Sequence, residues 1–189
     1  MSADYTIAFH YELDQGDFAA LTAKLRELAG TKANTYIARA LNKTAVSARK
    51  KLGTKAQESY TVKRGGFNKD MRIKNATAGH LVAEINSNGN TLEIKKFKYS
   101  APQSGVKVDI VKSGLKPLGK YGNKAFVGRG SAHGQVYVRT SKSRLPIEKL
   151  KSKSVPYMLG SNRVWTPTSP EIESDLKKFM AQQIALLLG

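Results

Sequence analysis

Acidic side chains that could support catalysis are scarce in the middle of this 189-residue chain. Glu93 and Asp109 lie in segments predicted as neighbouring strands, and Lys95 gives Glu93 the E-x-K spacing found in some nuclease sites. Metal-dependent hydrolysis of a phosphodiester needs several carboxylates that converge on one cleft. Charged pairs are common across exposed strands, so the tripeptide is better explained as surface strand. We assign no catalytic residue, and a small nuclease or toxin is the weakest alternative.

Metal and cofactor sites are not predicted either. His10, His80 and His133 are far apart in sequence, and none has a partner at the spacing of zinc ligands on a helix. The glycines at 128–134 nearly match a dinucleotide-binding loop, but a predicted strand follows them, so no helix N-terminus would hold a pyrophosphate. The chain has no P-loop, no nucleophile elbow and no cysteine. We therefore expect no enzyme activity, cofactor, metal or small-molecule substrate.

The basic residues give the strongest signal. The chain has 32 Lys+Arg against 14 Asp+Glu, a formal net charge of +18. Residues 31–160 hold 27 of the basic and six of the acidic residues, whereas residues 1–30 have a net charge of −3 and residues 161–189 are neutral. A basic middle between acidic and neutral ends is typical of a surface that meets a polyanion. A solvated basic surface that only aids solubility is the alternative.

Lysines and arginines gather around two glycine-rich segments. Glycine lets the backbone approach a phosphate chain closely, and lysine supplies a compact positive charge. No zinc finger or RNA-binding strand motif is present, so any nucleic-acid binding should be independent of sequence and sensitive to salt. The candidate polyanion-binding residues are Lys63, Arg64, Lys69, Arg72, Lys74, Lys120, Lys124 and Arg129.

Helices are predicted near both ends of the chain. Apolar residues recur at helical spacing over 18–28, 37–52 and 172–187, which gives each segment one apolar stripe. Gly30 should stop the first helix, and Thr31 or Asn34 should cap the second. Gly53 should end or kink the second helix, and residues 54–60 could continue it. Ser169 should cap the last helix, with Pro170 in its first turn. The stripes contain Phe18, Leu21, Leu25 and Leu28, then Ile37, Leu41, Ala45, Ala48 and Leu52, and finally Ile172, Leu176, Phe179, Met180, Ile184 and Leu187.

Alternating apolar residues predict strands between these helices. The alternation runs through residues 5–11, 81–85, 92–94, 106–110, 126–127 and 136–138, and the turn residues at 88–90 suit a hairpin. Residues 113–134 are rich in glycine and lysine and should form a flexible loop or arm. We expect a single α+β domain over 1–189, with the N-terminal helices and a C-terminal helix packed on a central antiparallel β-sheet.

Membrane insertion and export are not expected from the sequence. The N-terminus lacks the basic start and apolar run of a signal peptide. The longest apolar run is too short to span a bilayer. We therefore expect a soluble protein that is made in a cytoplasm and has no membrane partner.

Three short motifs occur in an order that resembles a known family. Residues 40–45 read A-L-N-K-T-A, residues 144–147 read R-L-P-I after an aromatic strand with an arginine, and residues 154–156 read S-V-P. Together with the basic segment 62–75, they resemble the minor tail protein Z family of tailed bacteriophages over about residues 30–188. The glycine–lysine segment departs from the family pattern, so no residue-level role is carried over to it.

The resemblance implies a structural phage or prophage protein without a cofactor, located in the tail of the virion and made in the host cytoplasm. Proteins of this family act in tail completion, near the end of the tail where head and tail join. We therefore expect a homo-oligomer, such as a ring near the DNA channel, with tail and head–tail connector proteins as partners. The basic face would meet either DNA, independently of its sequence, or an acidic protein. Arg144, Leu145, Pro146 and Ile147 are candidates for either a core or an assembly contact. The alternative function is sequence-independent nucleic-acid binding.

Overall fold

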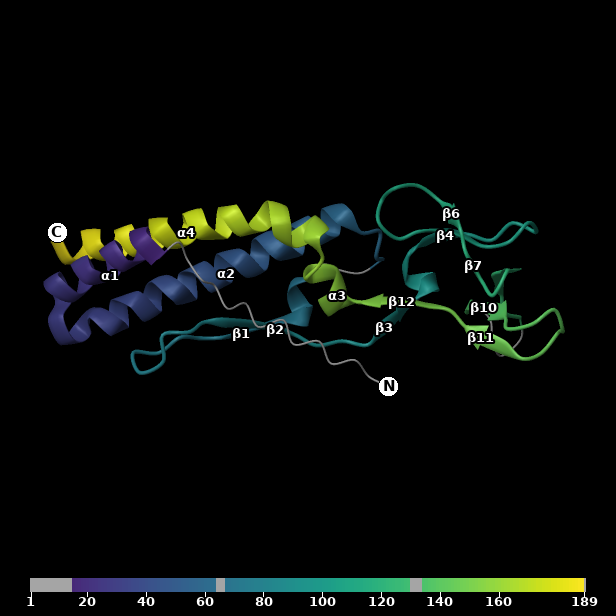
Figure 1. Ribbon diagram of the computed structural model, residues 1–189, viewed down its shortest axis with the longest axis horizontal. Coiled ribbons are helices and arrows are strands. Elements are labelled where there is room, and N and C mark those ends of the chain that lie inside the picture. Colours follow the sequence, from purple (N-terminus) through teal and green to yellow (C-terminus); the bar gives the residue numbers. More distant parts are fainter. Residues whose placement is uncertain (1–14, 64–66, 130–133, 189) are drawn as a thin grey trace.

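The computed structural model describes residues 15–63, 67–129 and 134–188, and it shows an α+β fold. Long helices occupy one end of an elongated molecule, with the hairpin of residues 71–87 beside them, and most of the other small antiparallel sheets lie toward the opposite end (Figure 1). Within these described ranges no helix combines the length and the apolar character needed to cross a membrane. The predicted strand at residues 5–11 lies outside the described residues.

Three helices form the helical end. They are α1 (Gln15–Ala29), α2 (Ala33–Ser59) and α4 (Asn162–Leu188). Leu25, Ile37, Leu176, Met180 and Ile184 are buried together between them, which confirms these parts of the predicted apolar stripes. Leu28 of the first stripe is instead 39% exposed, and the side chain of Phe18 lies outside the described residues. Most of α4 therefore packs on α1 and α2 rather than on a sheet, and only its first part, including Ile172, joins the core near the sheets.

The structure corrects the predicted starts of α2 and α4 and shows that α2 continues past Gly53. The residue before α2 is Lys32, no side chain caps this end, and the Asn34 amide instead donates to the Ala78 carbonyl at 3.1 Å. α2 continues through Gly53 to Ser59. The absence of a side chain at Gly53 leaves room for Asn68, since a Cβ at that position would lie 2.0 Å from Asn68 Oδ1. α4 starts at Asn162, well before Ser169, and contains Pro167 and Pro170.

The strands form several small sheets in place of one central sheet. β1 (Met71–Lys74) pairs with β2 (Glu84–Ser87), and β3 (Thr91–Glu93) pairs with β12 (Lys151–Ser154). The hairpin predicted at residues 88–90 is therefore wrong, because the strands on its two sides pair with different partners. The β1–β2 hairpin turns instead at residues 77–80, where Thr77 and His80 form an isolated antiparallel bridge.

The remaining strands lie beyond the helices. β5 (Lys107–Asp109) pairs on one side with β4 (Lys98–Ser100) and on the other with β6 (Lys116–Pro117). β10 (Val136–Arg139) lies between β9 (Phe126–Val127) and β11 (Ile147–Lys149), and β7 (Gly119–Lys120) pairs with β8 (Asn123–Lys124). The glycine–lysine segment predicted as a flexible arm thus contains four short paired strands up to residue 127. Residues 130–133 of that segment lie outside the described residues.

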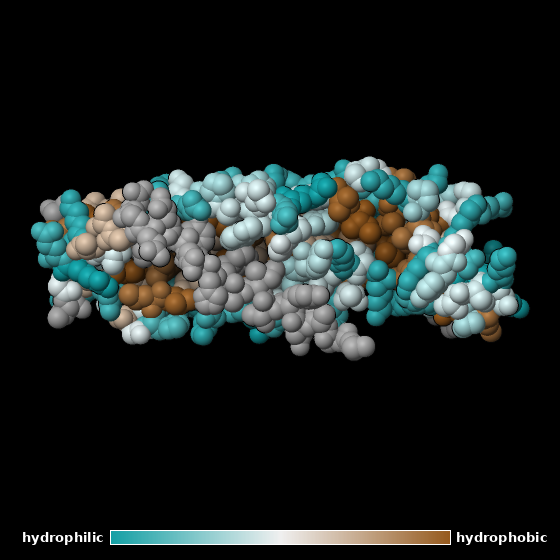
Figure 2. All heavy atoms as spheres, viewed as in Figure 1, coloured by the Kyte–Doolittle hydropathy of each residue, from teal (hydrophilic) through white to brown (hydrophobic). Residues whose placement is uncertain are grey.

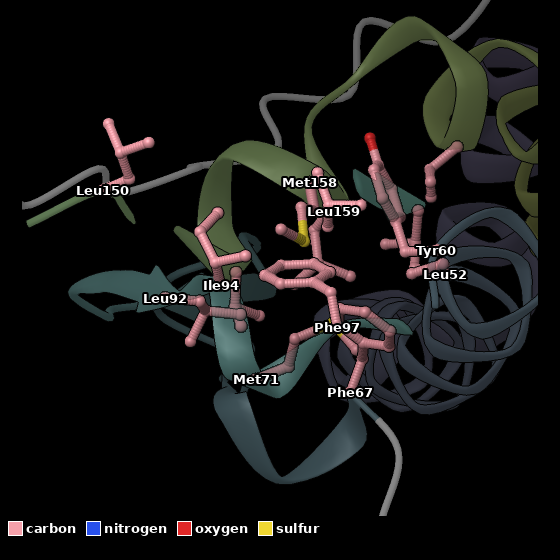
Figure 3. Packing of buried hydrophobic residues seen from close by; sticks show 14 of the residues in the cluster. Leu52, Tyr60, Phe67, Met71, Leu92, Ile94, Phe97, Leu150, Met158 and Leu159 are labelled. Carbon is pink, nitrogen blue, oxygen red and sulfur yellow. The ribbon is translucent and has the colours of Figure 1, made fainter. Parts of the chain in front are cut away.

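A core of large apolar side chains joins the two ends of the molecule. Phe97 is fully buried among residues of α2, β1, β3 and the short helix α3 (Val155–Leu159), as Figure 3 shows. Phe67, Met71, Ile94 and Met158 contribute to the same cluster. The Tyr60 hydroxyl at the end of α2 donates to Ser161 Oγ at 2.9 Å, just before α4 begins. Both long helices are therefore anchored to the sheet end.

Candidate polyanion-binding site

The structure separates the predicted polyanion-binding residues into two groups. Lys63 and Lys69 lie between the end of α2 and β1, and Arg72 and Lys74 lie on β1 itself. Lys120, Lys124 and Arg129 lie in and after β7 and β8 at the sheet end (Figure 1). Arg64 lies outside the described residues. The two groups do not form one continuous site.

The group near β1 is a set of separate surface charges. Lys69 and Arg72 are exposed, and within the described part of the chain neither forms an ion pair. Lys74 Nζ lies 3.5 Å from Glu84 Oε1 across the β1–β2 hairpin. Lys63 Nζ lies 5.7 Å from the centre of the Tyr99 ring, within cation–π distance.

Lys120 has a carboxylate partner. Its Nζ donates to both oxygens of Glu148 at 2.8 and 3.0 Å, and the Tyr121 hydroxyl donates to the same carboxylate at 2.8 Å. The hydrogen bond between Lys120 and Glu148 raises the pKa of the lysine and lowers the pKa of the carboxyl group. Lys120 is therefore a weaker candidate for an incoming phosphate than its neighbours.

The best candidate site is a pocket of about 510 Å³ at the sheet end, which we call the cationic pocket. Lys124, Arg129 and Arg139 line it, and none of the described residues around it is acidic. Lys124 and Arg129 form no ion pair with any carboxylate in the described ranges. Three cations thus share one concave surface, a composition that suits a phosphate or carboxylate group.

Short strands hold the cations of this pocket in place. Lys124 ends β8, and the next residue, Ala125, is buried and bonded through its backbone to Val106 and Leu118 at 3.0 and 2.9 Å. Gly105 has a φ of +119° and lies against the Lys124 side chain, where a Cβ would come within 3.3 Å. A larger residue there would be strained and would press on the lysine.

Arg139 enters the pocket from β10 and carries two interactions that orient it. Its guanidinium lies 5.4 Å from the centre of the Phe126 ring and donates to the Arg144 carbonyl at 2.9 Å. Phe126 in turn stacks on Tyr137 with ring centroids 6.3 Å apart. A guanidinium held over a ring keeps its remaining donors available for a planar anion.

Sequence reasoning missed Arg139 as a site residue. The signal was present, because the alternation in β10 turns Val136 and Val138 inward and places Tyr137 and Arg139 on the opposite face. Pairing of Tyr137 with Phe126 across β9 and β10 then brings the arginine beside the ring. That pairing could not be known without the register.

The acidic residues considered for a nuclease site do not meet. Glu93 lies on β3, which pairs with β12, whereas Asp109 lies on β5 between β4 and β6. Asp109 is buried and accepts from the Ser113 backbone N–H at 3.0 Å. Within residues 15–63, 67–129 and 134–188, no three His, Asp or Glu side chains lie close enough to hold a metal ion.

Glu93 instead forms a structural ion cluster. It accepts from Lys149 on β11, and its other oxygen lies 3.1 Å from Lys95 and 3.3 Å from the Gln135 amide. These partners, Lys149 first, lower the pKa of Glu93 from 4.5 to about 2, against the opposing effect of burial. The cluster ties β3 to the β10–β11 hairpin.

This ion cluster predicts that the stability of the protein depends on pH in the acidic range. Because the pKa of Glu93 is depressed in the folded state, its contribution to the stability of the protein is present above about pH 4.5 and is lost as the pH falls toward 2. The Glu93→Gln variant should therefore be less stable than the wild type at pH 6, with a smaller difference near pH 2.5. Urea unfolding at a series of pH values measures this, with Glu173→Gln on the exposed surface of α4 as control. A constant difference between Glu93→Gln and wild type across this range would contradict the prediction.

The three motifs of the family resemblance have different environments. Asn42 accepts from the Ala76 N–H at 2.7 Å and donates to the Ala76 carbonyl at 3.0 Å, which fastens α2 to the β1–β2 hairpin. Ser154 precedes α3, whose Val155 and Pro156 are buried. The segment Arg144–Ile147 instead forms an exposed tip between β10 and β11, where Leu145 is 66% and Ile147 39% exposed. The interpretation of that segment as buried core is therefore wrong.

Comparison of the chain with protein-family models, with curated proteins and with solved structures finds no match. The candidate site is therefore defined by its own geometry. That geometry consists of three cations around one pocket, an arginine oriented by an aromatic ring, and an exposed apolar tip on the adjoining hairpin.

Proposed function

We propose that this protein is a structural, non-enzymatic component of a bacteriophage or prophage tail that acts in tail completion and head–tail joining. In this proposal it assembles as a ring near the DNA channel and makes contacts with DNA that do not depend on sequence. The cationic pocket is the observation that carries the proposed contact with DNA. Support also comes from the resemblance of the motifs at 40–45, 144–147 and 154–156 to the minor tail protein Z family.

The charge distribution favours a polyanion over a small ligand. The pocket is open, its three cations come from separate strands or loops, and the Phe126 ring in its wall is already covered by Arg139. Such a surface suits the neutralisation of phosphates, a contact that carries no sequence information. Lys69 and Arg72 add further positive charge along the molecule.

The exposed tip at Arg144–Ile147 supports an assembly role. Leu145 and Ile147 are apolar side chains at the end of a hairpin, and the backbone carbonyl of Arg144 is held by Arg139. Contact between this tip and another subunit would bury apolar surface beside the cationic pocket. Burial of such side chains on association is favourable.

The test is a titration of random-sequence duplex DNA at several salt concentrations. Binding by the wild type should be weak, indifferent to sequence and steeply dependent on salt. The double variant Lys124→Gln/Arg129→Gln should bind more weakly at low salt and should reduce the log–log slope by roughly 0.9 for each phosphate that the protein no longer neutralises. Both side chains are exposed, so the fold should be retained.

A matched control removes the same charge from the helical end. Lys24→Gln/Lys43→Gln changes two exposed lysines of α1 and α2 and should leave the slope nearly unchanged. Equal effects of the two double variants would show that only net charge matters. Negligible affinity of the wild type at low salt would exclude the DNA contact and favour an acidic protein partner.

Mass measurement separates the leading proposal from the alternative. A ring or other closed oligomer is expected of a tail component, and Leu145→Asp should weaken it by placing a charge in the subunit contact. A monomer that binds duplex DNA tightly would instead favour a nucleic-acid-binding module. In an infectious phage, loss of head–tail joining in the Leu145→Asp variant would link the tip to assembly.

A further inference from the structure

A second pocket of about 510 Å³ lies between the end of α2, the segment around β6, and β12, and the proposed function does not use it. We call it the lysine groove. Lys116, Lys151 and Lys153 are exposed lysines along it, and none of the described residues that line it is acidic. Figure 2 shows hydrophobic surface in this part of the molecule, beside β4 and β6. The apolar side chains of the groove are Val108, Ile110, Val111, Leu118 and Met158.

Hydrogen bonds fix one wall of the groove before any partner binds. The Thr61 N–H, just after α2, donates to the Ile110 carbonyl at 3.1 Å. Asp109 is buried, and its carboxylate accepts from the Ser113 backbone N–H at 3.0 Å, which closes the turn between these two residues. The groove is therefore preformed, and a partner would lose little free energy in ordering it.

The lysines of the groove have no carboxylate partner in residues 15–63, 67–129 and 134–188. Neither Lys116 nor Lys151 forms an ion pair there, and Lys153 donates instead to the hydroxyl of Tyr157 at the edge of the groove. Available cations beside apolar surface favour a ligand that carries both negative charge and apolar groups.

The apolar surface favours a protein segment over a nucleic acid. A duplex meets most of its protein contacts through phosphate and sugar, so it would leave Val111 and Leu118 uncovered. A protein segment can place a leucine or phenylalanine between two carboxylates and satisfy both parts of the groove. The lysine groove differs in this respect from the cationic pocket, whose cations include two arginines.

The described surface of this chain does not offer such a segment. The exposed apolar tip at Leu145 and Ile147 lies close to Lys142 and Arg144 in sequence, so the lysines of the groove would repel it. Most carboxylates of the described ranges are already in ion pairs. These are Glu58, Glu84, Glu93, Glu148, Glu171 and Asp175.

We propose that the lysine groove is a docking site for an acidic segment of a different protein. In this complex an apolar side chain of the partner contacts Val111 and Leu118, and its neighbouring carboxylates meet Lys116 and Lys151. The docking site does not depend on DNA binding, and it lies apart from the three cations proposed to contact phosphate.

The probe is a fluorescein-labelled peptide, E-F-E-L-E-L-E, whose anisotropy is measured with the full-length chain at about 150 mM salt, where long-range attraction is screened. Binding should be saturable. The double variant Lys116→Glu/Lys151→Glu should weaken it roughly five- to tenfold, because two attractive contacts become repulsive. Lys24→Glu/Lys43→Glu makes the same change in net charge on exposed positions of α1 and α2 and should have little effect.

A second peptide separates the apolar contact from charge. E-S-E-S-E-S-E has the same charge and should bind several-fold more weakly. The variant Val111→Ser, at a half-buried position, should weaken the first peptide and leave the second unchanged. Far-UV circular dichroism of each variant checks that the fold is intact.

Four results would overturn the inference. They are absence of saturable binding to the folded chain, equal effects of the two double variants, equal affinity for the two peptides, and loss of self-association in Lys116→Glu/Lys151→Glu. The last result would assign the groove to another copy of this chain. Displacement of the peptide by duplex DNA in the Lys124→Gln/Arg129→Gln background would likewise assign the groove to nucleic acid.

Discussion

Replacing Phe97 with alanine is expected to lower the free energy of unfolding by roughly 3–5 kcal/mol. Phe97 is fully buried and packs against residues from α2, β1, β3 and α3 (Figure 3). Its ring fills the space where the helical end meets the sheets, so truncation leaves a void bordered by several elements. Because small domains are stable by only about 5–15 kcal/mol, the variant should be close to unfolding.

Urea unfolding followed by Trp165 fluorescence measures this loss. Trp165 is the only tryptophan of the chain and packs against the same core cluster, so its signal reports the region of the substitution. Leu145→Ala at the exposed hairpin tip is the control and should shift stability by less than about 0.5 kcal/mol. A loss below about 1 kcal/mol for Phe97→Ala would show that the sheet end does not contribute to the measured transition.

The helices were predictable from the sequence because their apolar residues keep a local period. Most of the residues that recur at helical spacing over 37–52 and 172–187 are buried, including Ile37, Leu52 and Ile184, whereas Leu28 of the first stripe is exposed. Helix ends were less predictable, since they depend on distant partners. Gly53 lies inside α2, and a glycine is needed there because a Cβ would clash with the side chain of Asn68 from the segment that follows the helix.

The pairing of the strands could not be predicted. Period-two alternation places β2, β5 and β10, but it does not say which strand lies beside which. β3 pairs with β12, about 60 residues later in the chain, and this pairing divides the expected central sheet. Turn residues at 88–90 suited a hairpin locally, but the long-range pairing determined the outcome.

The candidate site was predicted in part. Lys124 and Arg129 were named from their charge and the neighbouring glycines, and the structure brings them into one pocket. Lys120 was named on the same grounds, yet Glu148 binds it from a strand 28 residues away. Arg139 was missed because its role depends on the pairing of β9 with β10. Composition thus finds positive regions, while the fold decides which cations remain available.

Replacing Leu176 with alanine should cost roughly 2–5 kcal/mol, in the upper part of that range. Leu176 is 3% exposed in the core of the helical end and also lines an apolar space of about 70 Å³ between α2 and α4. Ala45 and Ala48 face that space, and their methyl groups are too short to move into the enlarged void. Leu186→Ala, on the exposed surface of the same helix, should change stability little.

The shape of the Leu176→Ala transition carries further information. α2 and α4 contribute residues to both core clusters, including Leu52 and Ile172 in one and Ile37 and Leu176 in the other. The two ends of the molecule should therefore unfold together, with the same midpoint by far-UV circular dichroism and by Trp165 fluorescence. Loss of helical signal at lower urea than the change in fluorescence would show that the helical end unfolds on its own. Coincident midpoints, shifted by the same amount, would establish that the long helices couple the sheet end to the helical end.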